Sequence, residues 1–226
     1  MSNIEPLPPV ILFQDEFLLA VDKAPGIPVQ PDRTGDLSLL QQVQALFPHG
    51  TIGSPHRLDR PVSGITLFTL TAPALRAMDA LYREKRVMKT YLAIVEGRMD
   101  AQGELQHQLS HAGGTRKAKV HETDGDVNAR LKFTTKAVGE RFSLIEVVPE
   151  GGAFHQIRAQ LGAAGHAIKG DVKYGARRGE QDRSIALHAW RMQFKHPITG
   201  QAMKLEAPFP ERSIWPALVP LVREWK

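Results

Sequence analysis

The hydrophobic positions of this chain fall into short apolar runs separated by turn-forming residues. Runs at residues 11–13 and 17–22 predict two strands joined by a polar turn. The proline- and glycine-rich stretch KAPGIPVQP interrupts the pattern and predicts an extended loop that can approach a ligand closely. From residue 39 to 47 the apolar side chains recur at helical spacing, and Pro48 and Gly50 end the predicted helix.

The middle of the chain predicts a buried strand, a helix and a second strand. The run ITLFTLT predicts the first strand, and the next segment has a helix cap at Thr71 and a proline suited to a first helical turn at Pro73. TYLAIVEG predicts the second strand. The stretch from residue 100 to 126 is polar, and we expect it to form long loops that carry at most a short hairpin.

The last hundred residues predict two hairpins around a helix. RLKFTTKAV and FSLIEVVPE are expected to pair, and FHQIRAQLGAAG predicts a helix closed by Gly165. Residues 184–200 alternate and then turn, so that residues 201–208 can pair back, and residues 215–226 predict a short terminal helix. Irregular alternation with several antiparallel hairpins favours an α+β fold around a mixed sheet. We expect residues 1–10 to be a flexible arm and residues 11–226 to be one domain.

Composition indicates the cell compartment and the kind of partner more than it indicates the reaction. The chain has 226 residues and no cysteine, which excludes disulfides and thiolate metal sites and favours a reducing compartment. No apolar run approaches the roughly 20 residues that a membrane helix needs, so we expect a cytoplasmic protein without a membrane partner. The formal charge of +5 favours an acidic partner, and nucleic acids are the commonest of these.

Four stretches hold more polar detail than a core requires: KAPGIPVQP, HRLDRPVSG, KTYLAIVEG and FHQIRAQLGAAGHAIKGDVKYG. In the second, Asp59 stands between Arg57 and Arg60, an arrangement that taken alone is more often a salt bridge in a loop than a catalytic group. In the fourth, His155 and Arg158 are three residues apart and share one helix face, so the opposite face can pack.

HRLDRPVSG resembles the His-Arg-Leu-Asp-x-x-Thr-Ser-Gly signature of the RluA-type RNA pseudouridine synthases, and the other three stretches match the remaining motifs of that family in order. The resemblance extends from about residue 11 to 208. It implies that a uridine in a stem-loop of ribosomal or transfer RNA is isomerised, without cofactor or metal, from an N-glycosidic to a C-glycosidic link. It also implies one catalytic domain over residues 11–226, with an active-site cleft across a bent, largely antiparallel sheet, no separate S4-like RNA-binding domain, and a monomer.

Motif position assigns a role to each matching residue. Asp59 corresponds to the essential catalytic carboxylate of the family, Tyr91 to the tyrosine that stacks on the flipped uracil, and Arg158 to the arginine that pairs with the aspartate. Arg57 corresponds to the arginine that displaces the target nucleotide from its stack. The full set that the resemblance assigns to substrate binding is Arg57, His56, Lys89, His155, Gln156 and Lys169.

Elementary chemistry agrees with these roles. Breaking an N-glycosidic bond builds oxocarbenium-like charge at the sugar, which a carboxylate can stabilise or trap, and a nearby arginine favours the ionised form of a desolvated acid. A stacked nucleotide must be extruded before its base can react, and a flat guanidinium can fill the gap. An aromatic ring supports the extruded base, and a phenol can relay a proton. Attack of Asp59 on the sugar, attack on the base and removal of a sugar proton all remain open.

The chain departs from the family pattern in three places. Residues 151–153 read Gly-Gly-Ala in place of Thr-Gly-Arg, Gln160 replaces a histidine, and Val62 replaces the threonine of the signature. These changes concern substrate contacts and support rather than the reacting groups. Two basic groups, if they flank the pocket, would bind phosphates and make RNA affinity depend on salt. They are Arg83, Lys85, Arg86 and Lys89, and Lys169, Lys173, Arg177 and Arg178.

Two other functions compete with this interpretation. A catalytically inactive RNA-binding or RNA-remodelling protein of the same fold would explain the altered residues 151–153 and Gln160. A metal-dependent nuclease would use histidines and aspartates. His155, His166 and His188 lack tight ligand spacing with a carboxylate, so we expect them to be structural rather than metal ligands.

Overall fold

A computed structural model describes residues 9–111, 117–121 and 126–217. The predicted arm therefore lies almost wholly outside the described residues. So does most of the predicted terminal helix, of which residues 215–217 are helical. None of the helices in the described ranges combines the length and the apolar character that crossing a membrane requires.

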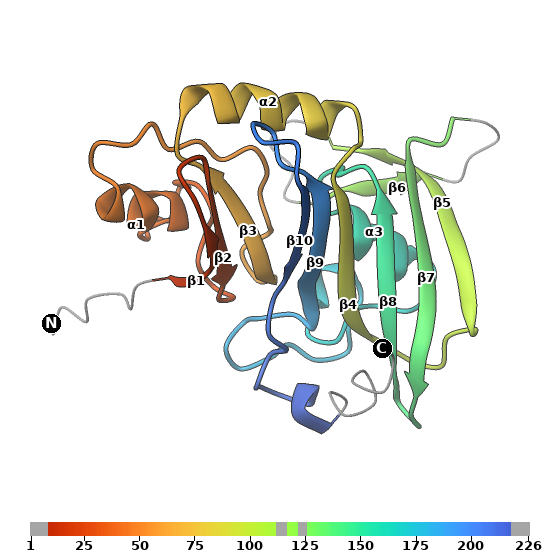
Figure 1. The fold of residues 1–226 in the computed structure, drawn as a ribbon. Helices are drawn as coiled ribbons and strands as arrows, with labels where there is room; N and C mark the ends of the chain where they lie inside the picture. Colours follow the sequence, from red (N-terminus) through yellow and green to blue (C-terminus); the bar gives the residue numbers. More distant parts are fainter. Residues whose placement is uncertain (1–8, 112–116, 122–125, 218–226) are drawn as a thin grey trace, which may run out of the picture.

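One mixed sheet contains ten strands, in the order β1-β2-β3-β9-β4-β8-β7-β5-β6, with β10 paired to β9 (Figure 1). The strands are β1 (Val10–Gln14), β2 (Leu18–Lys23), β3 (Ser63–Thr69), β4 (Met88–Glu96), β5 (Gln102–Ser110), β6 (Lys119–His121), β7 (Ala129–Val138), β8 (Phe142–Glu150), β9 (Leu187–Lys195) and β10 (Ala202–Glu206). The described pairs are antiparallel except β3 with β9. The predicted α+β fold with a largely antiparallel sheet is confirmed.

The prediction for residues 100–126 was wrong, because β5 is a nine-residue strand. The segment shows little alternation of apolar and polar residues, since Leu105 and Leu109 are its only large apolar residues. The strand forms because β7, which alternates clearly, offers its free edge and pairs with it from Gln102↔Thr134 to His107↔Ala129. Residues 102–110 are therefore a strand because of pairing with residues that are distant in the sequence.

The helices begin and end close to their predicted positions. They are α1 (Leu39–Leu46), α2 (Ala72–Arg83) and α3 (Gln156–Ala163). A capping box between Ser38 and Gln41 starts α1, and the hydroxyl of Thr71 accepts the N–H of Ala74 at 3.3 Å at the start of α2. The sequence did not predict the short 3₁₀ helix η1 (Val172–Tyr174), which follows α3.

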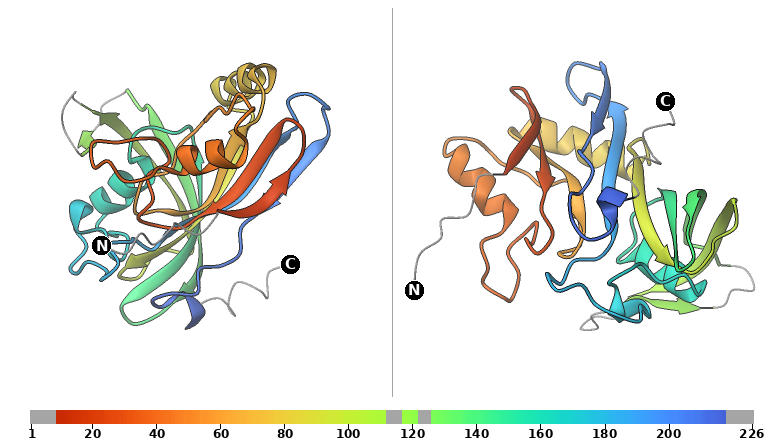
Figure 2. Two further views of the ribbon diagram at one scale, coloured as in Figure 1. Left: turned by 90° about the vertical axis from the view of Figure 1, so that its left-hand side faces the viewer. Right: turned by 90° about the horizontal axis from the view of Figure 1, so that it is seen from below.

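Strands β2 and β3 are buried on both faces and so separate two cores. In β2, Leu19 and Val21 point into the larger core with α1, whereas Leu18 and Ala20 point into a smaller core under α2. Figure 1 and the right-hand view of Figure 2 show β1–β3 and the β4–β8 strands on opposite sides of β9 and β10. Helix α3 covers the second half of the sheet and contacts β5, β6 and η1.

The two halves join where β3 meets β9. Only two residue pairs, Ser63↔His188 and Gly64↔Ala189, make the parallel contact. Gly64 has a φ of +107°, and a Cβ there would lie 2.3 Å from the carbonyl oxygen of Ala189. Only glycine allows both the conformation and the close approach. This junction places the loop before β3 next to the start of β4 and of α3.

Candidate active site

The loop that precedes β3 carries Asp59 into a cavity of about 260 Å³. A turn closed by the N–H of Val62 and the carbonyl of Asp59, 3.0 Å apart, gives the loop its shape. The cavity lies between this loop, the start of β4, the end of β8 and the N-terminus of α3. Its lining includes Arg57, Asp59, Lys89, Tyr91, Pro149, Gly151, His155, Gln156 and Arg158.

A buried chain of charges holds Asp59. Nη1 of Arg158 donates to Oδ2 of Asp59 at 2.9 Å. The other two guanidinium nitrogens, Nε and Nη2, donate to the two carboxylate oxygens of Asp171 at 2.7 and 2.9 Å. The Arg158 and Asp171 side chains are only 5% and 2% exposed, whereas Asp59 is 18% exposed. Arg158 therefore joins an internal carboxylate to one that faces the cavity.

Two interactions determine the charge of Arg158. Burial acts to lower its pKa, but the hydrogen bond and charge of Asp171, helped by Asp59, raise that pKa above its ordinary value. Arg158 is thus a fixed cation between two acids. The bidentate geometry with Asp171 sets the plane of the guanidinium and so fixes where Nη1 meets Asp59.

His155 lies beside Asp59 but outside the regular part of α3. It is the N-cap residue, with a left-handed backbone (φ 53°), and its Nε2 is 3.6 Å from Oδ2 of Asp59. Its Nδ1 lies 2.7 Å from the hydroxyl of Tyr174. Burial lowers the pKa of His155 to about 4, against the opposing charge of Asp59, so the imidazole is neutral at pH 7.

Tyr91 and Lys89 reach the cavity from alternate positions of β4. Burial, followed by the negative charge of Asp59, raises the pKa of the Tyr91 phenol above its ordinary value, which keeps the hydroxyl protonated. Nζ of Lys89 donates to the carbonyl oxygen of Gly151 at 2.6 Å, and burial lowers its pKa. Lys89 therefore supports the turn at residues 151–153 as well as lining the cavity.

His56 has a structural position at the edge of the cavity. Its Nε2 accepts the N–H of Leu67 at 2.9 Å, and its ring stacks on that of Tyr82 with centroids 5.3 Å apart. Burial and the charge of Lys89 lower the pKa of His56 to about 3. A neutral ring bonded to β3 anchors the loop, so these contacts do not support the predicted role of His56 in substrate binding.

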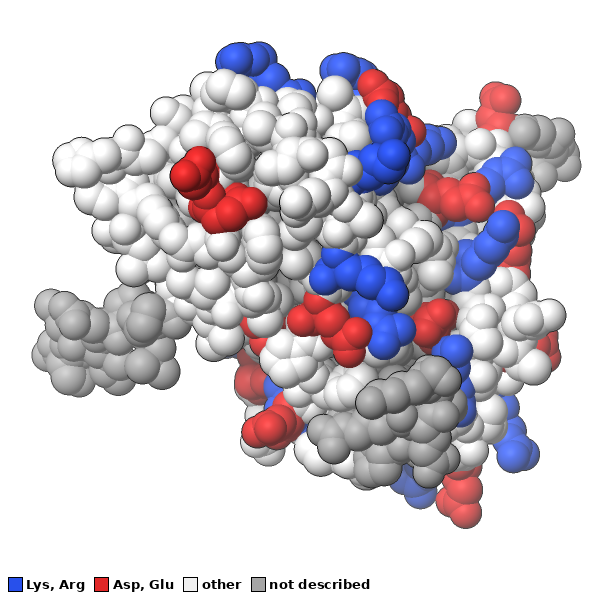
Figure 3. Space-filling model, viewed as in Figure 1, with Lys and Arg blue, Asp and Glu red and all other residues white. Residues whose placement is uncertain are grey.

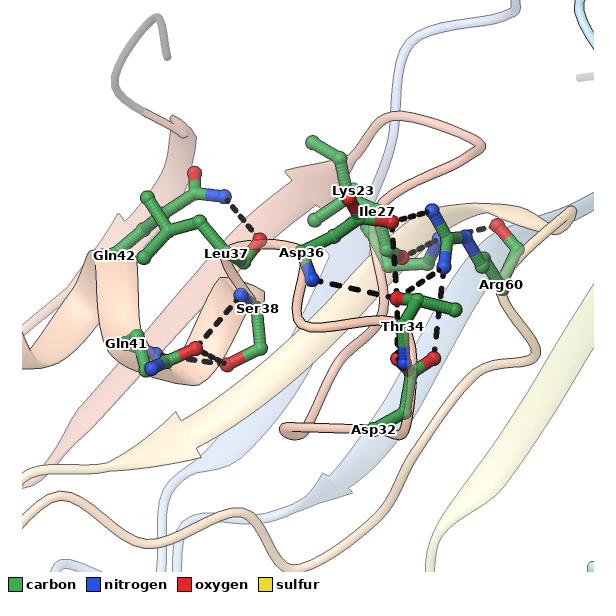
Figure 4. A network of polar contacts seen from close by, with 10 residues as sticks. All are labelled: Lys23, Ile27, Asp32, Thr34, Asp36, Leu37, Ser38, Gln41, Gln42 and Arg60. Carbon is green, nitrogen blue, oxygen red and sulfur yellow. Dashed lines mark hydrogen bonds and ion pairs between the residues drawn. The ribbon is translucent and has the colours of Figure 1, made fainter. Parts of the chain in front are cut away.

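The two arginines that flank Asp59 differ in their surroundings. Arg57 is exposed and lines the cavity. Arg60 instead bonds to the loop at residues 32–36: its guanidinium contacts Asp36 and donates to the hydroxyl of Thr34 at 2.9 Å (Figure 4). Arg60 therefore holds the Asp59 loop against the neighbouring loop.

The backbone after Asp59 is held by a buried lysine. Nζ of Lys23 donates to the carbonyl oxygens of Ala24, Ile27 and Arg60 at 3.0, 2.9 and 3.1 Å (Figure 4). Burial lowers the pKa of Lys23 to about 7, and the charge of Asp59 opposes that shift. Of the described residues that line the cavity, none comes from the KAPGIPVQP stretch, so this loop supports the Asp59 loop rather than approaching a ligand in that cavity.

Two glutamines attach α3 to the sheet. Gln156 lines the cavity, donates to the carbonyl of Arg130 at 2.9 Å and accepts the N–H of Ala153 at 3.2 Å. Nε2 of Gln160 donates to the carbonyl oxygens of Leu105 and Ala129 at 3.0 and 3.1 Å. The departure at Gln160 thus lies away from the reacting groups and fastens α3 to β5 and β7.

Lys169 lies in a different cavity from Asp59. A wider cavity of about 1020 Å³ lies at the opposite end of β4 and is lined by Glu96, Arg141, Lys169, Arg177, Arg178, Glu180 and Asp182, among others. Lys169 contacts Glu180 and donates to the hydroxyl of Ser213 at 3.0 Å. Lys169 therefore does not line the Asp59 cavity, because the chain turns away after α3 and its backbone pairs with β4 at Ile94. Its role in substrate binding stays a prediction.

The two predicted basic groups flank the Asp59 cavity only in part. Lys89 lines it, and Lys173 is close enough to lower the pKa of His155. Arg177 and Arg178 line the wider cavity instead. On the face in Figure 3, basic and acidic side chains are mixed, including those near the upper edge where α2 leads into β4.

The structure adds two site residues that the sequence did not single out. Asp171 and Tyr174 both belong to the stretch GDVKYG, which follows the helix of the last motif. The sequence signal that could have identified them is the presence of an acidic and an aromatic residue between two closely spaced glycines. Among the residues that the structure describes, no group of three or more histidines, aspartates and glutamates is arranged to hold a metal ion.

The architecture defines a class of protein. Human RNA Pseudouridylate Synthase Domain Containing 1 superposes with a TM-score of 0.75, at 21% identity and over 98% of each chain. Human RNA Pseudouridylate Synthase Domain Containing 4 superposes with a TM-score of 0.71, at 22% identity, over 95% of this chain and 93% of the other. At these identities the likeness concerns the fold, which is that of the pseudouridylate synthases.

Sequence relatives identify the family. Residues 17–163 match the family model for RNA pseudouridylate synthase. Ribosomal large subunit pseudouridine synthase C of Pasteurella multocida is 32% identical over 92% of this chain and 67% of its own length. The protein of the same name from Escherichia coli K12 is 32% identical over 93% of this chain and 70% of its own. The chain belongs to the RNA pseudouridylate synthase family and is an isomerase that forms pseudouridine in RNA.

Proposed function

We propose that Asp59 is the catalytic carboxylate and that the Asp59 cavity receives one uridine extruded from its RNA. The observation that carries the proposal is the buried link from Asp171 through Arg158 to Asp59, beside the aromatic ring of Tyr91. A carboxylate held by a fixed cation is the group that the developing charge on the ribose requires. A cavity of about 260 Å³ suits a single extruded nucleotide rather than a duplex.

The isomerisation balances without a cofactor. The bond between C1′ of the ribose and N1 of the uracil breaks, a bond between C1′ and C5 forms, the proton on C5 leaves, and N1 gains a proton. Asp59 assists this exchange of bonds at C1′ by attack on the ribose, attack on the base or removal of a ribose proton, and Tyr91 supports the base by stacking. The neutral Tyr91 phenol can exchange a proton with water at the cavity.

Arg57 opens the RNA stack in this proposal. Its side chain is exposed at the rim of the cavity, two residues before Asp59. A planar guanidinium stacks on bases and bonds to phosphates, so it can occupy the space that the extruded nucleotide leaves. Arg60 has its side chain bonded to residues 32–36 and is not available for this role.

The proposed substrate is ribosomal large-subunit RNA. The two named relatives are large-subunit pseudouridine synthases at 32% identity over more than nine-tenths of this chain. Transfer RNA is the alternative target, and action as a monomer stays a prediction. Because single-stranded loops are where RNA sequence is usually read, the target uridine is expected in a loop.

Mapping pseudouridine in total RNA from cells with and without this protein tests both the activity and the target. We expect one or more sites in large-subunit RNA to disappear in the deletion strain. The purified protein should release tritium from RNA labelled at uracil C5. Loss of sites in transfer RNA alone would exclude the ribosomal target, and no lost site together with no tritium release would exclude the activity.

Asp59→Asn separates catalysis from binding. We expect tritium release to fall by more than about a thousandfold, because the reacting carboxylate is gone, while RNA affinity stays within about threefold. Asp79→Asn, at an exposed position of α2, makes the same change of charge and is the control for general effects of surface charge. A catalytically inactive RNA-remodelling protein would instead keep its cellular function after Asp59→Asn.

A further inference from the structure

Tyr174 makes a directed set of contacts behind the active site. Its hydroxyl accepts the N–H of Ala118 at 2.8 Å and lies 2.7 Å from Nδ1 of His155. Its ring packs against the guanidinium of Arg158, with 5.2 Å between Cζ and the ring centroid. One side chain therefore contacts both residues that lie against Asp59.

The hydrogen bond from Ala118 favours one direction for the hydrogen bond between Tyr174 and His155. A backbone N–H can only donate, so the oxygen of Tyr174 is the acceptor in that bond. The single phenolic proton is then left to be donated, and Nδ1 of His155 is the acceptor within reach at 2.7 Å, which favours the tautomer in which Nδ1 accepts. A neutral imidazole that accepts at Nδ1 carries its own proton on Nε2, and Nε2 is the atom that faces Oδ2 of Asp59 at 3.6 Å.

We propose that Tyr174 is a positioning residue that holds His155 as its Nε2–H tautomer, so that His155 and Arg158 both occupy Oδ2 of Asp59 and leave Oδ1 as the oxygen that reacts. This inference rests on the proposed role of Asp59. It names the reacting atom of that carboxylate and adds two residues, His155 and Tyr174, to the groups that orient it.

The surroundings of His155 favour this arrangement. Its ring is stacked on Phe154, with centroids 3.8 Å apart, and meets the ring of Tyr174 edge on. Its left-handed backbone is unfavourable for a residue other than glycine, so surrounding contacts must hold it in place, and such conformations are commonly retained at functional sites. The 3.6 Å separation is longer than a hydrogen bond, and such contacts often tighten when substrate binds.

The charges around His155 determine how it responds to pH. Burial lowers the pKa of His155, Asp59 and Asp171 favour its protonation, and Arg158 and Lys173 oppose it. In the proposed arrangement the Tyr174 hydroxyl also stabilises the neutral ring by donating to Nδ1. Removing that hydroxyl therefore raises the pKa of His155. A protonated His155 would add a second cation beside Oδ2 and weaken the reactivity of Asp59.

Nitrogen NMR of the full chain labelled with ¹⁵N-histidine measures the tautomer directly. At pH 7.5, His155 of the unaltered protein should show its proton on Nε2, with the signals assigned by their absence in His155→Gln. Tyr174→Phe should give a mixture of tautomers or the Nδ1–H form. A proton on Nδ1 in the unaltered protein would overturn the proposal without any variant, as would an unchanged spectrum in Tyr174→Phe.

Kinetics provide the second readout. Tyr174→Phe should lower the single-turnover rate of tritium release roughly fivefold to tenfold, the effect of one lost hydrogen bond, with RNA affinity unchanged and the acid limb of the pH profile moved to higher pH. The matched control is Tyr82→Phe, because among the described residues the Tyr82 hydroxyl has one hydrogen-bond partner, the sulfur of Met192 at 3.8 Å. A decrease in affinity with an unchanged rate would assign Tyr174 a merely structural role.

The two proposals fail in different ways. If the unaltered protein releases no tritium from any RNA, the proposed function fails, whereas the tautomer of His155 still decides the positioning role. If tritium is released and Asp59→Asn abolishes it, but the spectrum and pH profile of Tyr174→Phe match those of the unaltered protein, only the role of Tyr174 fails.

Discussion

Arg158 is the residue on which the electrostatics of the cavity depend. Its three guanidinium nitrogens bond to Asp59 and Asp171, and its side chain is almost completely buried. A helix arginine is usually solvated, and the helical spacing of the sequence did not exclude that alternative. Burial beside two carboxylates makes the difference, because a desolvated charge must have a partner.

Replacing Arg158 should cost more stability than any surface arginine. Arg158→Met leaves the carboxylate of Asp171, 2% exposed, without its cation, and we expect the free energy of unfolding to fall by about 3 to 5 kcal/mol. Arg86→Met, in an exposed pair, should cost less than about 1 kcal/mol. Urea denaturation measures both. Equal losses for the two variants would contradict a buried charge pair, and adding Asp171→Asn to Arg158→Met should recover part of the loss.

Tyr91 combines an aromatic face with a hydroxyl, and two substitutions separate these contributions. Tyr91→Phe keeps the ring, so RNA affinity should be retained while turnover falls. Tyr91→Leu removes the stacking surface and should weaken RNA binding by about 1 to 3 kcal/mol. Affinities measured in the Asp59→Asn background avoid turnover of the RNA. If Tyr91→Leu binds as tightly as Tyr91→Phe, Tyr91 does not stack on the base.

At the scale of elements, the junction of β3 and β9 determines where the Asp59 loop lies. The parallel contact contains two residue pairs, and Gly64 is in one of them. Because the chain leaves the loop at residue 62 and enters β3 at Ser63, any shift of β3 against β9 moves Asp59 relative to α3. The junction therefore contributes to function although it lies outside the cavity.

Gly64→Ala should disturb this junction strongly. The left-handed φ and the 2.3 Å approach of a Cβ to the Ala189 oxygen together should lower the free energy of unfolding by about 2 to 5 kcal/mol. Gly200→Ala also has a positive φ but open space around it, so it should cost only about 1 to 2 kcal/mol. Chemical denaturation compares the two, and equal costs would show that the close approach is unimportant.

At the scale of the whole molecule, buried histidines link stability to pH. Burial lowers the pKa of His56 and His188 to about 3 and that of His155 to about 4. In the unfolded chain each titrates near 6.5, so below that pH the unfolded state binds more protons than the folded state. Asp22 opposes this, because burial raises its pKa to about 6 and the folded state then binds the extra proton.

The free energy of unfolding should consequently fall as the pH decreases from 6.5 to 4.5. Near pH 5 the three histidines each take up about one proton on unfolding, and Asp22 releases about one, so the net uptake is about two protons. The free energy of unfolding should therefore change by about 3 kcal/mol per pH unit. Denaturant midpoints at a series of pH values measure the slope. His188→Gln should reduce the proton uptake on unfolding by about one, and the slope should decrease in proportion. A free energy of unfolding that rises on acidification over this range would contradict the lowered pKa values of the three histidines.

Sequence patterns predicted the elements whose periodicity is strong and missed those that depend on partners. Strands β4, β7 and β8 and helices α1 and α2 follow from local apolar spacing and caps. Strand β5 does not, because its own residues are polar and β7 supplies the reason for it to be extended. In the site, the ordered motifs singled out Asp59, Tyr91 and Arg158, whereas contacts across the fold decided the positions of Lys169 and His56.

By itself, the sequence determined the fold class and the family and supplied the proposed reacting groups, because periodicity and ordered motifs are local properties of the chain. Only the tertiary structure decided that Arg158 is buried between two acids, that Arg60 and Lys23 support the loop rather than the substrate, and that Tyr174 reaches His155. Those relations join residues up to 99 positions apart, as Asp59 and Arg158 are. Distances of that kind depend on how the sheet brings its strands together, which no local pattern encodes.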